Sequence, residues 1–226
     1  MAVLDEGKYS LTDEFDIHHG IYPIANRIMR DHNAHRGGYE RLSVEEIIQA
    51  SSNVGTAQMV MGTFGSNPSK YIEKLYSYRL NDSLPIQMKG VAKPWIKHPR
   101  KDKDLWYATS LAWISIGYET KIPPIYSLTF YNAIANNGKM VKPLFVHEIR
   151  KNGQTVKAFP TEVMVEQICK PSTLKDVQQA MRGVVEGKYA TARNVKSDIV
   201  TVAGKTGTAL ISQGAAGYRS GQTKYN

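Results

Sequence analysis

The stretch Val200-Thr-Val-Ala-Gly-Lys-Thr-Gly-Thr-Ala-Leu-Ile211 is the most informative part of the chain. β-Branched residues on both of its flanks favour a strand. Its middle interrupts the apolar run with a cation, two hydroxyl groups and a residue without a side chain. A site explains these residues better than a strand does, because an ammonium group attracts an anion, hydroxyls hydrogen-bond a carboxylate and a glycine lets a ligand lie against the backbone. The candidate site residues in this stretch are Lys205, Thr206, Gly207 and Thr208.

The length and composition place few limits on function. A chain of 226 residues forms one large domain or two small ones and can bury a sizeable core. Its 42% hydrophobic and 22% charged residues are ordinary for a globular protein. No apolar run approaches the length of a membrane-spanning helix, and no secretory segment follows Met1. We therefore expect any export or anchoring segment to lie outside this sequence.

The net charge of +9 does not indicate a nucleic-acid partner. Basic residues are scattered, and the densest cluster, between Lys97 and Lys103, alternates with Pro99 and Asp102. That pattern is typical of a loop and not of a surface that follows phosphates. The single cysteine, Cys169, excludes an internal disulfide and lies among apolar residues, so we predict a small core side chain.

Two histidine pairs raise the question of a metal. His18-His19 and His32-x-x-His35 lie in a polar region without a cysteine or glutamate at ligand spacing. Imidazoles in a polar loop are usually solvated, so we predict neither a metal site nor a cofactor.

Caps, breakers and periodicity predict the remaining elements. Residues 2–4 are predicted as a helix remnant, and a long loop is expected from there to about residue 40. Ser43-Val-Glu-Glu46 is a capping box that begins a short helix. The other predictions are helices over 56–64, 68–80, 125–135 and 172–187, an irregular connection over 81–104, a buried helix or strand over 105–117, and a hairpin around Asn152-Gly153.

A second polar motif precedes the helix over 56–64. Ser51-Ser52-Asn53 lies at the junction of two predicted helices, where serine and asparagine are also good helix caps. Chemically, Ser51 can relay a proton as donor and acceptor, and the Asn53 amide can orient both a cation and a carbonyl group. Ser51 and Asn53 are therefore candidate catalytic residues together with Lys205.

Both motifs, in this order, occur in the serine penicillin-recognising enzymes as Ser-x-Asn and Lys-Thr-Gly. Further segments strengthen the resemblance. The segments that carry it are 51–57, 115–119, 132–143 and 203–209. From about Gly37 to Ile211 the chain resembles the transpeptidase domain of a class B penicillin-binding protein of the cell-division type. The resemblance implies an α+β fold, here a helix-rich fragment with an incomplete antiparallel sheet.

The resemblance also implies a reaction and a role for each motif. The intact enzyme would be a D,D-transpeptidase that cross-links peptidoglycan stem peptides ending in D-Ala-D-Ala through a serine acyl-enzyme, and β-lactams would mimic the substrate. Ser51 would move protons, Asn53 would hold a catalytic lysine and the acyl side chain, and Lys205 would supply positive potential. Thr206 and Thr208 would bind the terminal carboxylate beside Gly207.

One departure from the family pattern is serious. The nucleophile motif Ser-x-x-Lys should precede Ser51, and the sequence contains this motif only as Ser172-Thr-Leu-Lys175, which a helix N-cap explains. We therefore expect residues 1–226 to be a partial transpeptidase domain, truncated at both ends and inactive by itself. The alternatives are a penicillin-recognising hydrolase, which is a carboxypeptidase or β-lactamase, and a non-catalytic binding or scaffold domain.

The resemblance finally implies a location and partners. The full-length protein is expected to be anchored in the bacterial inner membrane with this domain in the periplasm, and the fragment is expected to be soluble. Its expected partners are the stem peptide, β-lactams and membrane proteins of the division complex.

Overall fold

A computed structural model of the protein describes residues 1–208. The chain forms two compact units, and each consists of segments that are distant in sequence. The first unit holds Met1–Glu6, Asn67–Leu105 and Thr120–Gln178. The second unit holds Gly7–Ser66, Trp106–Glu119 and the chain from Gln179 onward. All the candidate site residues belong to the second unit.

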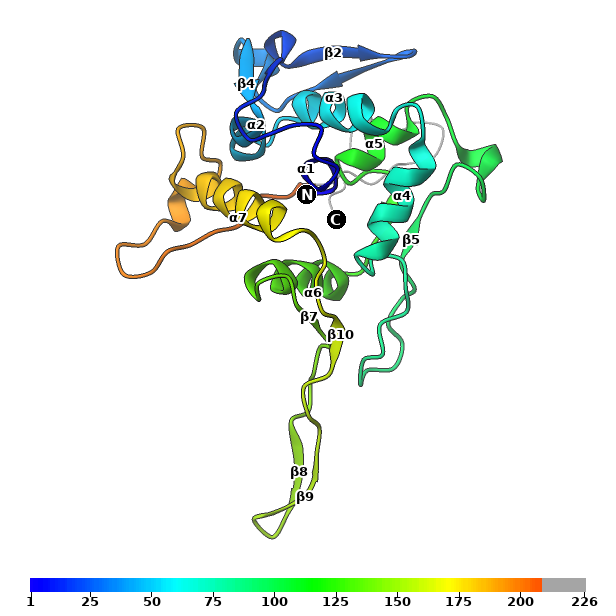
Figure 1. The fold of residues 1–226 in the computed structure, drawn as a ribbon, viewed down its shortest axis with the longest axis vertical. Coiled ribbons are helices and arrows are strands. Elements are labelled where there is room, and N and C mark those ends of the chain that lie inside the picture. Colours follow the sequence, from blue (N-terminus) through cyan, green and yellow to red (C-terminus); the bar gives the residue numbers. More distant parts are fainter. Residues whose placement is uncertain (209–226) are drawn as a thin grey trace. The chain divides into compact units, whose positions relative to one another are not determined.

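The second unit combines short antiparallel strand pairs with helices. Strand β1 (Glu14–Asp16) pairs with β4 (Arg41–Ser43), and β2 (Ile21–Ile24) pairs with β3 (Arg27–Arg30). The helices of this unit are α2 (Val44–Ala50), α3 (Asn53–Phe64), α5 (Ser110–Ser115) and the second half of α7 (Pro171–Glu186). Figure 1 shows α2 directly after β4 and α3 beside α5. These four short strands lie between residues 14 and 43, whereas the sequence predicted a loop as far as about residue 40.

The start of α2 follows the sequence prediction. Ser43 accepts a hydrogen bond from the backbone N–H of Glu46 at 3.2 Å, and the Glu46 carboxylate accepts one from the N–H of Ser43 at 3.0 Å. This capping box satisfies two backbone donors at the helix N-terminus. It fixes where α2 begins and, seven residues later, where Ser51 lies.

The core of the second unit is formed by apolar side chains from the residue that follows β1, from β4 and from the helices. Ile17, Leu42, Ile47, Val54 and Phe64 are all at most 1% exposed. Each contributes about 1.5–3 kcal/mol by leaving water. Residues at both sides of the Ser51 turn therefore anchor it in the core.

The first unit holds the other helices and the remaining strand pairs. Its elements are α1 (Ala2–Asp5), α4 (Pro68–Ser77), β5 (Trp95–Ile96), β6 (Thr120–Lys121), α6 (Pro124–Ala135), β7 (Met140–Val141), β8 (Glu148–Lys151), β9 (Gln154–Ala158) and β10 (Val163–Val165). Strand β5 pairs with β6, β7 with β10 and β8 with β9, all antiparallel. Figure 1 shows the β8–β9 hairpin extending beyond the β7–β10 pair. Asn152 and Gly153 form its turn with φ of +51° and +78°, as the sequence predicted.

Two further predictions about elements are wrong. Residues 200–208 form no strand, and the last three residues of the predicted strand, 209–211, lie outside the described residues. A strand needs a partner for its backbone groups, and the described chain offers this segment no ladder. Helix α7 begins at Pro171, and the carbonyl of Lys170 accepts the N–H of Leu174, so Ser172 lies inside the first turn and is not the N-cap.

Within residues 1–208, none of the helices is long and apolar enough to cross a membrane. Cys169 is buried, as predicted.

Candidate active site

Ser51 occupies the sharp turn between α2 and α3. Its backbone has φ of +53° and ψ of +43°, the left-handed conformation that ends α2. This conformation is unusual for a residue with a side chain, and such outliers persist where the surrounding structure holds them. The neighbouring Ser52 begins α3 as its N-cap, with its Oγ accepting the N–H of Gly55 at 3.0 Å.

The end of strand β3 holds this turn in place. Asp31 is 5% exposed, and its carboxylate accepts hydrogen bonds from Ser52 Oγ at 2.7 Å and from the N–H of Val54 at 2.9 Å. The Asn53 side chain donates to the carbonyl of Arg30 at 2.9 Å. These three bonds join Arg30 and Asp31, at the end of β3, to residues 52–54. The sequence reasoning missed Asp31, since it gave residues 2–40 to a loop.

Lys205 meets Ser51 across 154 positions of sequence. Its Nζ donates to Ser51 Oγ at 2.6 Å and to the carbonyl oxygen of Thr206 at 3.1 Å. The two motifs that the sequence analysis assigns to one site are therefore in contact. Burial lowers the pKa of Lys205 to about 8, because the charged ammonium loses hydration. An amine with this pKa changes its charge near neutral pH, which is the property that proton transfer requires.

Thr206 is linked to a residue that the sequence reasoning did not find. Its Oγ1 lies 3.1 Å from Thr191 Oγ1, and the Thr191 hydroxyl donates to the carbonyl of Gln49 at 3.0 Å. Because Thr191 uses its only proton on Gln49, Thr206 is the donor in the bond between the two threonines. Thr191 lies 14 residues before Lys205 in a polar loop, and its sequence context carries no signal of this role.

The other two residues of the predicted carboxylate site are open to solvent. A Cβ added at Gly207 would meet nothing within 4 Å, and Thr208 is exposed. The segment is attached to the unit by the N–H of Gly204, which donates to the carbonyl of Met181 at 3.1 Å. The structure thus brings Ser51, Lys205 and Thr206 together. In the part of the chain that it describes, no hydrogen bond joins Asn53 or Thr208 to them.

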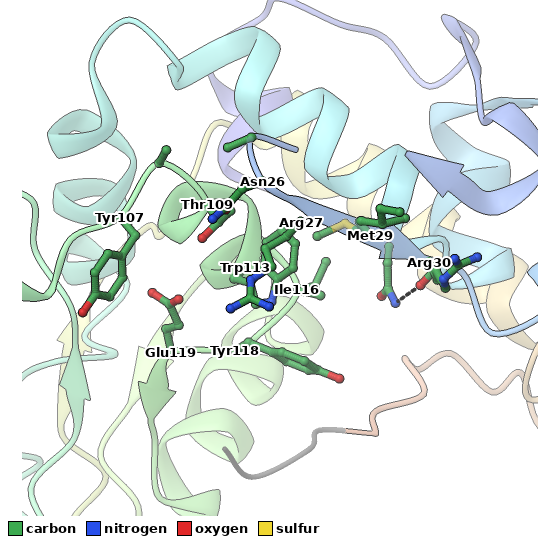
Figure 2. Close-up of a pocket in the computed structure, with 14 residues that line it drawn as sticks. Asn26, Arg27, Met29, Arg30, Tyr107, Thr109, Trp113, Ile116, Tyr118 and Glu119 are labelled. Atoms are coloured by element: carbon green, nitrogen blue, oxygen red, sulfur yellow. Dashed lines mark hydrogen bonds between the residues drawn. The ribbon is translucent and has the colours of Figure 1, made fainter. Parts of the chain in front are cut away.

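A pocket of about 700 Å³ is lined in part by Asn53. Its other walls are the turn after β2, strand β3 and residues in and around α5. Figure 2 shows Arg27 reaching from β3 toward Trp113 and Glu119, and Arg30 with its side chain directed away from them.

The fold and these motifs define a class of protein, the penicillin-binding transpeptidase domains. A family model described as the penicillin binding protein transpeptidase domain matches residues 1–225. The chain belongs to this family, and its α+β, helix-rich fold with small antiparallel sheets is the one that the sequence predicted.

Individual relatives agree with a class B member. The chain is 27% identical over 208 residues to a probable peptidoglycan D,D-transpeptidase FtsI of Caulobacter vibrioides, covering 91% of this chain and 31% of that protein. It is 28% identical over 212 residues to a probable peptidoglycan D,D-transpeptidase PenA of Neisseria gonorrhoeae, with coverages of 91% and 31%. The chain thus spans about a third of the length of these relatives.

Solved structures share the fold. The apo transpeptidase domain of Burkholderia pseudomallei penicillin-binding protein 3 matches with a TM-score of 0.78 and 20% identity, covering 96% of this chain and 59% of that one. A putative peptidoglycan glycosyltransferase from Atopobium parvulum matches with a TM-score of 0.77 and 24% identity, with coverages of 99% and 49%.

Proposed function

We propose that this chain carries the substrate-binding and proton-relay part of a D,D-transpeptidase that cross-links peptidoglycan stem peptides. The observation that carries the proposal is the 2.6 Å contact between Lys205 Nζ and Ser51 Oγ. No local folding rule brings together residues 154 positions apart, whereas a shared site does. Membership of the family and two relatives named as probable D,D-transpeptidases support the same reaction.

The proposed reaction proceeds in two steps through a serine ester. A serine hydroxyl attacks the carbonyl of the D-Ala-D-Ala bond, the C–N bond breaks, and the released D-Ala takes a proton. The amine of a second stem peptide then attacks the ester, a new amide forms and the serine is released. The chain needs no cofactor for this chemistry, because both steps are acyl transfers.

In this proposal Ser51 and Lys205 deliver the proton to the leaving amine. Lys205 donates to Ser51 Oγ, so the proton of the Ser51 hydroxyl is available to another acceptor. Asn53 would orient the acyl side chain and a catalytic lysine. The N–H of Thr208 would donate to the oxyanion, a contribution worth about 3–4 kcal/mol per donor in other acyl-transfer enzymes.

The carboxylate of the substrate would lie beside Lys205, Thr206 and Thr208. Thr206 now donates to Thr191, so we infer that its hydroxyl rotates when a carboxylate arrives. Gly207 leaves the space that this carboxylate would occupy. β-Lactams would bind in the same place and acylate the same serine.

The nucleophile is not assigned to the formal Ser-x-x-Lys match. Ser172 and Lys175 are both exposed on α7, and no hydrogen bond joins their side chains in the described structure. We propose that the nucleophile and its lysine come from sequence that precedes this chain in a longer protein. That protein would be anchored in the inner membrane, would act in the periplasm and would meet membrane proteins of the division complex.

The test uses the complete protein and two assays, acylation by a β-lactam and cross-linking of peptides, and the first compares variants. Lys205→Ala should lower the rate of acylation by a β-lactam about 100-fold or more, which is the scale for removing one group that stabilises the reacting centre. Lys175→Ala is the matched control, because this exposed lysine should leave the rate unchanged. Equal losses in both variants would refute the assignment of Lys205.

The cross-linking assay separates the proposal from its alternatives. A peptide ending in D-Ala-D-Ala, given together with an amine acceptor, should yield a cross-linked dimer. Hydrolysis without cross-linking would indicate a carboxypeptidase or β-lactamase, and absence of both products would indicate a binding or scaffold domain.

A further inference from the structure

Apart from Asn53, the residues that line the 700 Å³ pocket have no part in the proposed reaction. The pocket is bordered by the turn between β2 and β3, by β3 itself and by aromatic side chains from the region of α5. Its lining residues are Ala25, Asn26, Arg27, Ile28, Met29, Arg30, Asn53, Tyr107, Ala108, Thr109, Trp113, Ile116, Tyr118 and Glu119. A volume of about 700 Å³ is large enough for part of a peptide.

Arg27 is the cation that this pocket offers to a ligand. Its side chain reaches into the space near Trp113 (Figure 2), while the side chain of Arg30 points away. Within residues 1–208, the Arg27 guanidinium makes no hydrogen bond or ion pair. A guanidinium presents a planar fork of donors that matches a carboxylate with two parallel hydrogen bonds.

One carboxylate, Glu119, also lines the pocket, and it has an interaction of its own. The pocket is therefore not a general basic patch. A ligand anion is favoured only where it meets Arg27 directly, so the pocket selects the position of a negative charge along the ligand.

The geometry of β3 sets that position. Asn53 bonds the carbonyl of Arg30, and Arg27 lies three residues earlier on the same strand. Three residues of a strand span about 10 Å, and three residues of an extended peptide span about the same length. For a peptide that runs alongside β3 with its reacting bond beside Asn53, a group about three residues upstream would lie at Arg27.

We propose that this pocket is a specificity subsite in which Arg27 binds a free carboxylate of a peptide, about three residues from its reacting end. The inference rests on the proposed transpeptidase function and adds the class of substrate. The carboxylate could belong to the peptide that acylates the enzyme or to the peptide that supplies the amine. The chemistry is the same in both cases, and the two steps of the reaction distinguish them.

The experiment uses the complete protein and two synthetic peptides that end in D-Ala-D-Ala. One carries a carboxylate three residues upstream, and the other carries a carboxamide there. Release of D-Ala reports the first step, and transfer to an acceptor peptide, again with a carboxylate or a carboxamide, reports the second. We expect the protein to prefer the carboxylate by about 10-fold in one of the steps, the value of one charged hydrogen bond in a partly exposed pocket.

The variants are Arg27→Gln, Arg27→Lys and, as a control, Arg36→Gln. Arg27→Gln should abolish the preference, Arg27→Lys should retain part of it, and Arg36→Gln, at an exposed arginine that does not line the pocket, should leave it intact. Acylation by a β-lactam without a corresponding carboxylate should change by less than about twofold in Arg27→Gln. This last readout keeps the proposed function testable independently of the subsite.

Either of two results would overturn the subsite. The first is an equal rate for the carboxylate and the carboxamide in both steps of the unaltered protein, a comparison that needs no variant. The second is a preference that survives in Arg27→Gln. If β-lactam acylation itself fails in the unaltered protein, the proposed function fails and the subsite fails with it.

Discussion

At Ser51 the backbone conformation and the chemistry make opposite demands. A φ of +53° favours glycine, yet the hydroxyl that meets Lys205 requires a serine. We predict that Ser51→Gly is more stable than Ser51→Ala by about 1 kcal/mol, because the Cβ of alanine comes too close to the backbone in this conformation and glycine has no Cβ. Urea denaturation measures the difference. The order should reverse at Ser127, an exposed position inside α6, because glycine inside a helix is less stable than alanine by about 1 kcal/mol.

Lys205 provides a second prediction at the same scale. Burial lowers its pKa from 10.5 to about 8 in the folded protein. Between these values the unfolded chain binds more protons than the folded one, so the contribution of Lys205 to the free energy of unfolding rises with pH across this window and is flat below it. Denaturation at pH 7 to 10.5 should show this rise in the protein relative to Lys205→Met.

The exposed Lys175 supplies the control for this titration. Lys175→Met removes a lysine from the exposed side of α7, so it measures what the loss of one exposed lysine does to stability at the same pH values. A carbon NMR titration that placed the Lys205 amine at the usual lysine value would contradict the prediction, whatever the stability data showed.

At the scale of elements, Asp31 connects β3 to the start of α3. Replacing it by alanine leaves the Ser52 hydroxyl without its acceptor and the N–H of Val54 without a partner in the core. Each buried group left in this state costs about 1–3 kcal/mol, so Asp31→Ala should lower the free energy of unfolding by about 2–4 kcal/mol. Asp198→Ala, at an exposed aspartate of the same unit, should change it by less than about 0.5 kcal/mol.

A second variant tests whether the loss of stability comes from the missing hydrogen bonds. Asp31→Asn keeps the shape of the side chain and can still accept one hydrogen bond, so it should recover part of the loss. A result in which the alanine variant matched the Asp198 control would mean that β3 does not hold the turn.

The elements also show why some of the fold follows from sequence and some does not. The capping box at Ser43 and the turn at Asn152-Gly153 are satisfied by residues a few positions apart, so local patterns predict them. The β-branched residues around Lys205 predicted a strand, but pairing depends on other strands, and the described chain provides none there. β-Propensity alone could not reveal this.

Some residues of the candidate site could likewise be predicted from the sequence, and others could not. Ser51, Asn53 and Lys205 could be predicted because they belong to two short motifs that resemble those of a known enzyme family. Asp31 and Thr191 act through contacts 21 and 15 positions away, to Ser52 and Thr206, and nothing in their local sequence distinguishes them from ordinary loop residues. Only the folded arrangement assigns them.

At the scale of the whole molecule, the question is whether residues 1–226 react with a penicillin. Acylation needs a serine activated by a base within hydrogen-bond reach. The chain contains Ser-x-x-Lys only at Ser172, whose side chain is exposed and not bonded to Lys175 in the described structure. Lys205 and Ser51 are in contact, but in the proposed reaction this pair serves the leaving group and not the attack. We therefore predict that the chain by itself forms no covalent adduct.

A fluorescent penicillin followed by a denaturing gel provides the measurement, with a β-lactam-reactive transpeptidase as the positive control. No fluorescent band should appear at the mass of the chain, and circular dichroism should confirm that the sample is folded. A band that disappeared in Ser172→Ala would make that serine the nucleophile. A band that disappeared in Ser51→Ala would give the attack to Ser51, with Lys205 as its base through the 2.6 Å contact. Either outcome would reverse the roles assigned above, because the chain would then hold a complete acylating pair.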